Sequence, residues 1–293
     1  MPFQTLNEIR RTLQAAGMRP RHKHGQHFLI DRNLMQKLVD SAEIGPDDVV
    51  LEIGPGTGSL TSLLADLAGW VVTVEIDARI AEVARRHLAH HDNVTLLVTD
   101  ALRGKNHLSP EVIEALLDKH RQMAGRCLLV ANLPYNAASP IVADLLLEVP
   151  QVKMLCFTVQ KEVADRMAAA PRTGDYGPLS VVLQVLARVK RIARVPPQAF
   201  WPAPDVESAI VRIEPDLQRR AAAGDPQHVA AVVHRLFLHR RKTLWQNLRL
   251  AYGDEADALK GKIAIDWRQR PEELAVVDWI QLAMVLPAPP GDS

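Results

Sequence analysis

Apolar residues along this chain fall into short runs that alternate with segments of helical spacing. Five runs rich in valine, leucine and isoleucine have the length of buried strands, namely Val49–Ile53, Val71–Ile76, Val94–Thr99, Cys127–Ala131 and Met154–Val159. Apolar residues three and four positions apart predict helices between these runs, at Leu60–Leu67, Arg79–Ala89, Pro110–Lys119 and Ile141–Leu147. The alternation predicts an α/β fold, in which a doubly wound, Rossmann-like parallel sheet is covered by helices on both faces. A ligand is expected at the carboxyl ends of the strands.

The sequence predicts that the chain is divided into three parts. Residues 1–24 are polar and basic and form an N-terminal arm with room for one short helix, and residues 25–215 hold the α/β domain. Residues 216–293 consist of helix formers without strands, which predicts a small helical domain with a loose proline-rich tail.

Three further segments carry local predictions within the α/β domain. Asp31–Ala42 has helical spacing, with Asp31 as its N-cap. Leu179–Val189 is rich in β-branched residues yet could be helical, whereas Ala209–Ile213 predicts a terminal strand.

Composition narrows the class of protein without deciding its function. The 293 residues are 47% hydrophobic and 24% charged, which is typical of globular proteins. The formal net charge of +1 argues against a surface coated throughout with basic residues, although it leaves room for a local basic face. Cys127 and Cys156 lie inside apolar runs, which predicts buried thiols rather than a disulfide. Arg10 and Arg11 interrupt the N-terminal segment, so no signal peptide is expected and a cytoplasmic location is predicted.

A glycine-rich loop follows the first predicted strand. Gly54, Gly56 and Gly58 would allow a tight turn and close approach of a ligand to the backbone. No Gly-Lys-Ser/Thr closes the loop, which excludes a P-loop, and its G-x-G-x-G spacing disfavours a nicotinamide oxidoreductase. Glu52 precedes the loop, and a carboxylate there would suit a cofactor with a positive charge better than a pyrophosphate. S-adenosylmethionine carries such charges on its sulfonium and ammonium groups.

Two more acidic residues close the next two strand-like runs. Glu75 lies about 20 residues after the loop in the sequence. In nucleotide-binding folds, an acidic residue at this sequence separation accepts hydrogen bonds from the ribose hydroxyls of the bound nucleotide. Asp100 could accept from the amino group of the cofactor's adenine. The alternative is that both acids only cap the helices that follow.

The segment Asn132-Leu133-Pro134-Tyr135 follows the fourth strand-like run and predicts a site for a planar amine. An aryl amine is a poor nucleophile because its lone pair is delocalised into the ring. The side-chain carbonyl of Asn132 and a main-chain carbonyl near Leu133 or Pro134 could hold both N–H groups and favour a tetrahedral nitrogen. Pro134 would fix the loop, and Tyr135 would stack on the base with Phe157 or Phe200 as the opposite wall. The alternative is a turn that only ends a strand.

Together these segments resemble the ribosomal RNA adenine dimethyltransferase family, whose members modify two adjacent adenosines near the 3′ end of small-subunit rRNA. The matches run in family order from about residue 20 to 215. They are His24-Gly25-Gln26-His27-Phe28-Leu29-Ile30-Asp31, Glu52-Ile53-Gly54-Pro55-Gly56-Thr57-Gly58, Asn132-Leu133-Pro134-Tyr135-Asn136, Gln160-Lys161-Glu162-Val163, Tyr176-Gly177-Pro178-Leu179-Ser180, and Phe200-Trp201-Pro202-Ala203-Pro204 running into Val206-Glu207-Ser208-Ala209.

The resemblance implies a class I methyltransferase domain that uses S-adenosyl-L-methionine, followed by a small helical domain. It assigns cofactor contacts to His27 and Leu29, together with Gly54, Gly56, Glu75, Asp100 and Asn132, and catalytic roles to Asn132, Pro134 and Tyr135. It also implies a substrate within a pre-ribosomal particle, and we expect a monomer. The family usually has asparagine where His27 stands, and a histidine there can still donate from one ring nitrogen.

Basic residues gather in the N-terminal arm, at Arg19, Arg21 and Lys23, and in the tail domain. Arg240, Arg241 and Lys242 are predicted to contact RNA phosphates, with a solvated helix face as the alternative. No cysteine or acid pattern makes His22, His24 and His27 a metal site, so no metal is expected.

Two other functions remain open from the sequence. One is a large-subunit rRNA methyltransferase of the antibiotic-resistance type, which the segment at 200–204 and the tail domain disfavour. The other is a non-catalytic nucleic-acid binder on a methyltransferase scaffold, which would bind the cofactor without methylating RNA.

Overall fold

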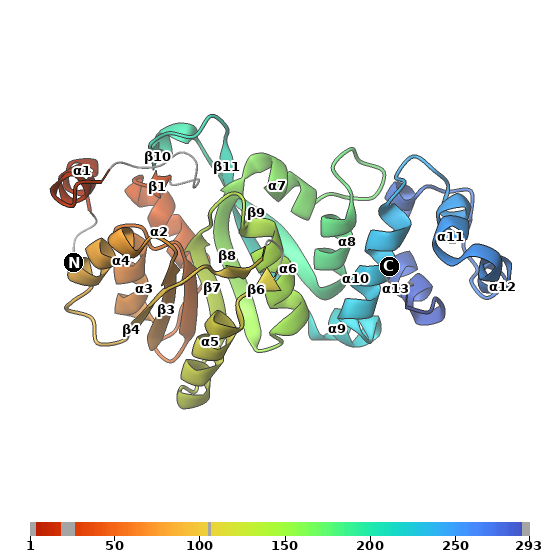
Figure 1. Cartoon of the computed structure of the whole chain (residues 1–293), viewed down its shortest axis with the longest axis horizontal. Helices are drawn as coiled ribbons and strands as arrows, with labels where there is room; N and C mark the ends of the chain where they lie inside the picture. Colours follow the sequence, from red (N-terminus) through yellow and green to blue (C-terminus); the bar gives the residue numbers. More distant parts are fainter. Residues whose placement is uncertain (1–3, 19–26, 105–106, 289–293) are drawn as a thin grey trace. The chain divides into compact units, whose positions relative to one another are not determined.

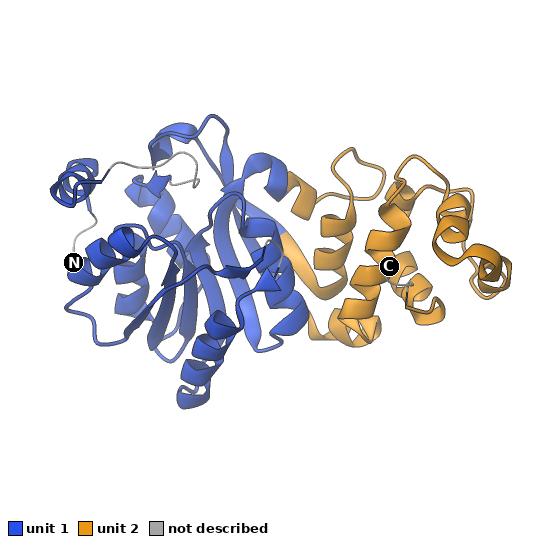
Figure 2. Cartoon of the chain, in the orientation of Figure 1, with its two compact units in different colours: residues 1–164, 190–214 blue, residues 165–189, 215–293 orange. Residues whose placement is uncertain are grey.

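The computed structural model describes residues 4–18, 27–104 and 107–288 and divides the chain into two compact units. Unit 1 comprises residues 1–164 and 190–214, and unit 2 comprises residues 165–189 and 215–293 (Figure 2). The segment 165–189 therefore groups with the C-terminal helices, whereas the sequence predicted it within the α/β domain. Tyr176 explains this grouping, because its fully buried side chain donates a hydrogen bond to the Leu274 carbonyl at 2.9 Å.

Unit 1 is built on a seven-stranded sheet with the order β4-β3-β2-β7-β8-β11-β9 (Figure 1). The five predicted strands are all present and run parallel to one another. They are β2 (Val49–Ile53), β3 (Trp70–Glu75), β4 (Val94–Val98), β7 (Cys127–Asn132) and β8 (Val152–Gln160). The predicted terminal strand is β11 (Ser208–Pro215), which pairs antiparallel with β8. The sheet is therefore mixed, with β11 antiparallel beside the five parallel strands, and the predicted Rossmann-like α/β fold is confirmed.

The segment at 179–189 divides between two elements. Helix α8 (Pro178–Leu186) ends where the edge strand β9 (Ala187–Val195) begins. Two short antiparallel pairs complete the strands: β1 (Phe28–Leu29) pairs with β10 (Phe200–Trp201), and β5 (Leu102–Arg103) pairs with β6 (His107–Leu108).

Helices cover both faces of the sheet, as predicted (Figure 1). Helices α2 (Arg32–Asp40) and α3 (Ser59–Leu67) contribute Leu38 and Leu64 to one buried cluster with Val50 and Leu128. The neighbouring strand residues point to the other face. There α5 (Pro110–Gln122) packs on β2 and β3, and α6 (Ala138–Glu148) packs on β8.

Three more helices belong wholly or partly to unit 1, namely α1 (Leu6–Ala15), α4 (Ala78–His87) and α7 (Lys161–Met167).

Side-chain capping sets the starts of several helices. Asp31 caps α2, as predicted, because its Oδ1 accepts from the Leu34 amide at 3.0 Å. A capping box formed by Thr5 and Glu8 begins α1.

Unit 2 packs its helices around aromatic side chains. Besides α8 it contains α9 (Leu217–Ala223), α10 (Pro226–Phe237), α11 (Leu244–Tyr252), α12 (Ala256–Lys260) and α13 (Val276–Val285). Trp279 is fully buried and stacks on Phe237 with ring centroids 5.0 Å apart. Within the described ranges, no helix has the length and apolar character needed to cross a membrane.

Candidate active site

A cavity of about 590 Å³ opens in unit 1 where β2, β3, β4 and β7 end. Residues from segments far apart in the sequence line it. Among the predicted site residues, the lining contains His27, Leu29, Gly54, Gly56, Glu75, Asp100, Asn132 and Pro134. The structure thus brings the glycine loop, both strand-end acids and the Asn132 turn to one place, as expected for parallel strands.

The glycine loop takes a backbone conformation that side chains resist. Gly54, Gly56 and Gly58 have φ values of +79°, +57° and +89°. A Cβ atom on Gly56 would lie 2.7 Å from Cε1 of Phe28, so any larger residue would push this ring away from the cavity. The loop and the N-terminal segment at Phe28 therefore fit together only with glycine at this position.

Glu52 lies in the cavity wall with almost no solvent exposure. Its Oε2 accepts hydrogen bonds from the hydroxyls of Thr61 at 2.6 Å and Thr73 at 2.8 Å. Burial nevertheless raises the pKa of this carboxyl to about 7. A positive charge in the cavity would favour its ionised form.

Glu75 and Asp100 do not cap helices. Glu75 is buried, its Oε1 accepts from the Asp77 amide at 3.0 Å, and burial raises its pKa. The N-cap of α4 is Asp77 instead. Asp100 is exposed, and its Oδ1 accepts from the Leu102 amide at 2.9 Å, at the start of the β5–β6 hairpin. The capping alternative is wrong for both, which leaves two carboxylates at the cavity.

Asn132 is the last residue of β7 and is held from two sides. Its side-chain nitrogen donates to the main-chain carbonyl of His27 at 2.8 Å, and its Oδ1 accepts from the hydroxyl of Thr158. A carbonyl oxygen has two acceptor sites, so Oδ1 retains one for a ligand in the cavity.

The carbonyl of Pro134 is already occupied by the start of α6. It accepts from the amides of Ala137 at 3.0 Å and Ala138 at 3.1 Å. Of the two main-chain acceptors considered from the sequence, this leaves the carbonyl of Leu133.

Tyr135 lies beside the cavity rather than in its lining. Its hydroxyl bonds the Ser208 hydroxyl at 2.8 Å, and its ring stacks on the His27 ring at 5.4 Å. Phe157 and Phe200 are buried in the interior and do not line the cavity, so the prediction that either forms an opposite wall is wrong. Phe28 lines it instead.

Helix α1 supplies contacts that sequence reasoning missed. Ile9 lines the cavity, and Oε1 of Gln4 accepts from the hydroxyls of Thr57 and Ser59, each at 2.6 Å. The Thr5–Glu8 capping box is the signal that could have revealed this helix. The predicted arm residues Arg19, Arg21, Lys23, His22 and His24 lie outside the described residues.

The predicted RNA-contacting residues follow α10 in unit 2. Arg240 donates to the carboxylate of Glu272 and to the carbonyl of Gly174 at 2.8 Å, so its guanidinium anchors a loop. Arg241 and Lys242 are exposed. Arg241 and Arg270 line a surface hollow of about 450 Å³ beside the Arg240–Glu272 pair, and neither forms an ion pair with another described residue.

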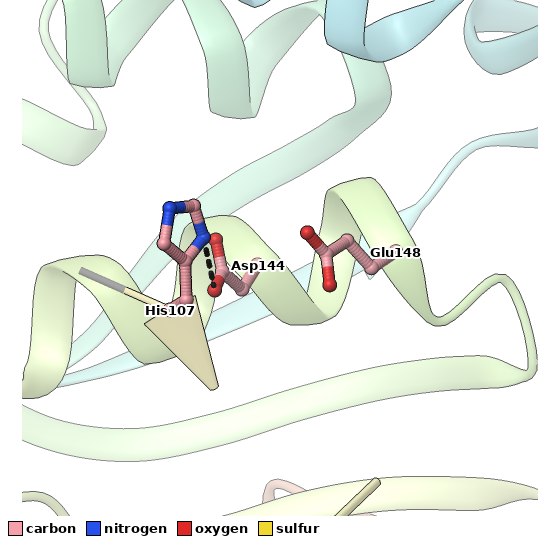
Figure 3. Close-up of side chains that lie close together, drawn as sticks. All are labelled: His107, Asp144 and Glu148. Atoms are coloured by element: carbon pink, nitrogen blue, oxygen red, sulfur yellow. Dashed lines mark ion pairs between the residues drawn. The ribbon is translucent and has the colours of Figure 1, made fainter. Parts of the chain in front are cut away.

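His107, Asp144 and Glu148 form a cluster of side chains (Figure 3). None of the three lines the cavity. In the part of the chain that the structure describes, this is the one group of three side chains with donors close enough to hold a metal ion. The buried Asp144 accepts from the Leu108 amide at 2.6 Å and lies 3.5 Å from Nδ1 of His107. These contacts tie strand β6 to helix α6.

Comparisons with known proteins agree with this arrangement. Residues 17–286 match the family model described as ribosomal RNA adenine dimethylase. Proteins named ribosomal RNA small subunit methyltransferase A are similar over most of the chain. The one from Pediococcus pentosaceus is 36% identical over 93% of this chain and 92% of its own length, and that from Bacillus licheniformis is 37% identical over 88% of each.

Solved structures show the same fold. A 23S rRNA methyltransferase, ErmE, is 28% identical with a TM-score of 0.62, over 88% of this chain and 99% of its own. A dimethyladenosine transferase from Plasmodium falciparum has a TM-score of 0.68 at 23% identity, over 87% of this chain and 96% of its own.

Proposed function

The chain belongs to the ribosomal RNA adenine dimethylase family, and we propose that it dimethylates the N6 amines of two adjacent adenosines near the 3′ end of small-subunit rRNA. It is a methyltransferase that uses S-adenosylmethionine. The observation that carries the proposal is the meeting of the glycine loop, Glu75 and the Asn132 turn around one cavity.

The cavity residues fit this cofactor. Glu52 offers a buried carboxyl whose ionisation a positive charge would favour, and Glu75 offers a buried acceptor for hydroxyl groups. Gly56 leaves room for close approach to the backbone. When bound, the cofactor supplies a methyl group activated by its sulfonium.

The residues of the chain act by positioning and electrostatics. Oδ1 of Asn132 and the carbonyl of Leu133 would accept the two N–H groups of adenine, which localises the nitrogen lone pair. The ring of Tyr135 would stack on the base, a contact that contributes about 1–3 kcal/mol in nucleic-acid complexes. Each methyl transfer would place a positive charge on the amine nitrogen and acidify its N–H, so one proton per transfer could leave to water without a strong base.

Unit 2 would hold the RNA backbone. Arg241, Lys242 and Arg270 are suited to contact phosphates, while Arg240 keeps the neighbouring loop in place. We also propose that the protein acts as a monomer, in the cytoplasm, on small-subunit rRNA within a pre-ribosomal particle.

The proposal is tested by mapping methylated adenosines in rRNA from cells with and without the protein. We expect two adjacent dimethylated adenosines in small-subunit rRNA that disappear without it. Asn132→Ala should fail to restore them while binding the cofactor within about tenfold of wild type, since Asn132 is one of several cofactor contacts but the side-chain acceptor for the amine. The control is Asn33→Ala, the same change on the exposed face of α2.

The map also separates the alternatives. Methylation confined to large-subunit rRNA would contradict the assigned substrate. Cofactor binding without methylation of any RNA would identify a non-catalytic nucleic-acid binder.

A further inference from the structure

Asn132 and Thr158 lie opposite each other on neighbouring strands. They are register partners in the parallel pair β7–β8, just where β7 reaches the cavity. The hydroxyl of Thr158 donates to Oδ1 of Asn132. Thr158 itself is fully buried and does not line the cavity.

The direction of both hydrogen bonds on the Asn132 amide follows from the partners. The main-chain carbonyl of His27 can only accept, so the amide nitrogen must face it at 2.8 Å. The opposite side of the amide is then Oδ1, and the hydroxyl of Thr158 must donate to it. The His27 carbonyl therefore excludes the flipped amide, which would place Oδ1 against it.

We propose that Thr158 is a positioning residue for methyl transfer, because it holds Oδ1 of Asn132 so that the remaining acceptor site faces the substrate amine. This inference rests on the proposed function. Thr158 acts through Asn132 and touches neither substrate nor cofactor.

Packing alone does not explain a hydroxyl at this position. Thr158 and its neighbours along β8, Phe157 and Val159, are all buried. The backbone of β8 pairs with β7 on one side and β11 on the other. Valine has nearly the same shape and an equal preference for strands, and it brings no polar group into the interior. The hydroxyl therefore serves the Asn132 amide rather than the sheet.

The test compares Thr158→Val and Thr158→Ser with wild type. Methyl incorporation into small ribosomal subunits isolated from cells lacking the protein gives kcat, and calorimetry gives the Kd for S-adenosylmethionine. We expect Thr158→Val to lower kcat about tenfold, in line with the loss of one hydrogen bond, with the cofactor Kd within about twofold. Thr158→Ser, which keeps the hydroxyl, should restore kcat to within about threefold of wild type.

A matched control is Thr95→Val in β4, whose hydroxyl accepts from the indole of Trp70 at 2.9 Å, away from the cavity. It should leave kcat unchanged. Thermal unfolding checks that each variant folds, and Thr158→Ala replaces Thr158→Val if the latter does not.

The outcomes separate this inference from the proposed function. Absence of transfer by wild type would overturn the proposed function itself. Active wild type with an equally active Thr158→Val would overturn the role of Thr158, as would a loss of kcat that Thr158→Ser does not recover.

Discussion

Glu52 is a buried carboxyl in the wall of the cavity at the strand ends. Two threonine hydroxyls donate to one of its oxygens. Burial outweighs these hydrogen bonds and raises the pKa of the carboxyl from 4.5 to about 7. The protein without its cofactor therefore holds Glu52 in protonated form over much of the acidic range.

The raised pKa predicts how stability depends on pH. The folded state binds the proton of Glu52 more tightly than the unfolded chain does, so this contribution is complete below pH 4.5 and is lost as the pH rises through about 7. The whole difference corresponds to about 3 kcal/mol. The free energy of unfolding of the cofactor-free protein should fall over this interval, and Glu52→Gln should flatten the fall.

Urea denaturation between pH 5 and 8 measures this effect. The pKa of Glu75 is also raised by burial, whereas burial lowers the pKa of His87 and His91, which gives a contribution of opposite sign. These groups are the same in wild type and Glu52→Gln, so the difference between the two slopes reports Glu52. Glu111→Gln, on an exposed position of α5, is the control. An identical slope in wild type and Glu52→Gln would contradict the prediction.

At the scale of elements, the hairpin β5–β6 depends on one carboxylate of α6. Asp144 is buried, and it satisfies the amide of the equally buried Leu108. The other strand of this hairpin begins beside Asp100, and Leu102 lines the cofactor cavity. The hydrogen bond between Asp144 and the Leu108 amide therefore supports the hairpin that carries Leu102, although Asp144 itself does not line the cavity.

Asp144→Ala should destabilise the fold by about 1–3 kcal/mol, because the Leu108 amide would stay buried without an acceptor. Urea denaturation gives the value. Asp118→Ala on α5 is the comparison, since Asp118 pairs with Arg121 on the surface and such pairs contribute less than about 1 kcal/mol. Equal effects of the two substitutions would show that the buried contact is not needed.

How well each element could be predicted from the sequence depends on how it is buried. Strands β2, β3 and β7 are buried on both faces, so they read as unbroken apolar runs and their ends were predicted within a residue. Edge strand β9 carries the exposed residues Arg188, Lys190 and Arg191, so the sequence showed no apolar alternation there. Asp100 and Asn132 could be named because each follows such a run. Thr158 and Ile9 could not, since their roles depend on strand register and on where α1 packs.

At the scale of the whole molecule, a nearly neutral chain concentrates positive charge locally. The net charge is +1, yet Arg241 and Arg270 share one hollow of unit 2. The neighbouring Arg240 is neutralised by Glu272, so it contributes to the shape of the hollow more than to its charge.

Arg241→Glu and Arg270→Glu should each weaken binding to small ribosomal subunits and reduce the slope of log K against log salt by about 1. Filter binding from 50 to 200 mM salt measures both quantities. Arg268→Glu makes the same charge change at a position where the arginine is 91% exposed and paired with Asp266, and it should have a smaller effect. If all three behave alike, the hollow has no special role in RNA binding.

Gln4 and helix α1 bring the N-terminal part of the described chain against the cavity. Gln4 joins Thr57 and Ser59, and Ile9 completes the wall. Purification tags fused ahead of Met1 would therefore end only a few residues from a ligand-binding surface. Affinities measured on such fusions would report the tag as well as the enzyme, so a carboxyl-terminal tag is the better choice for every experiment described above.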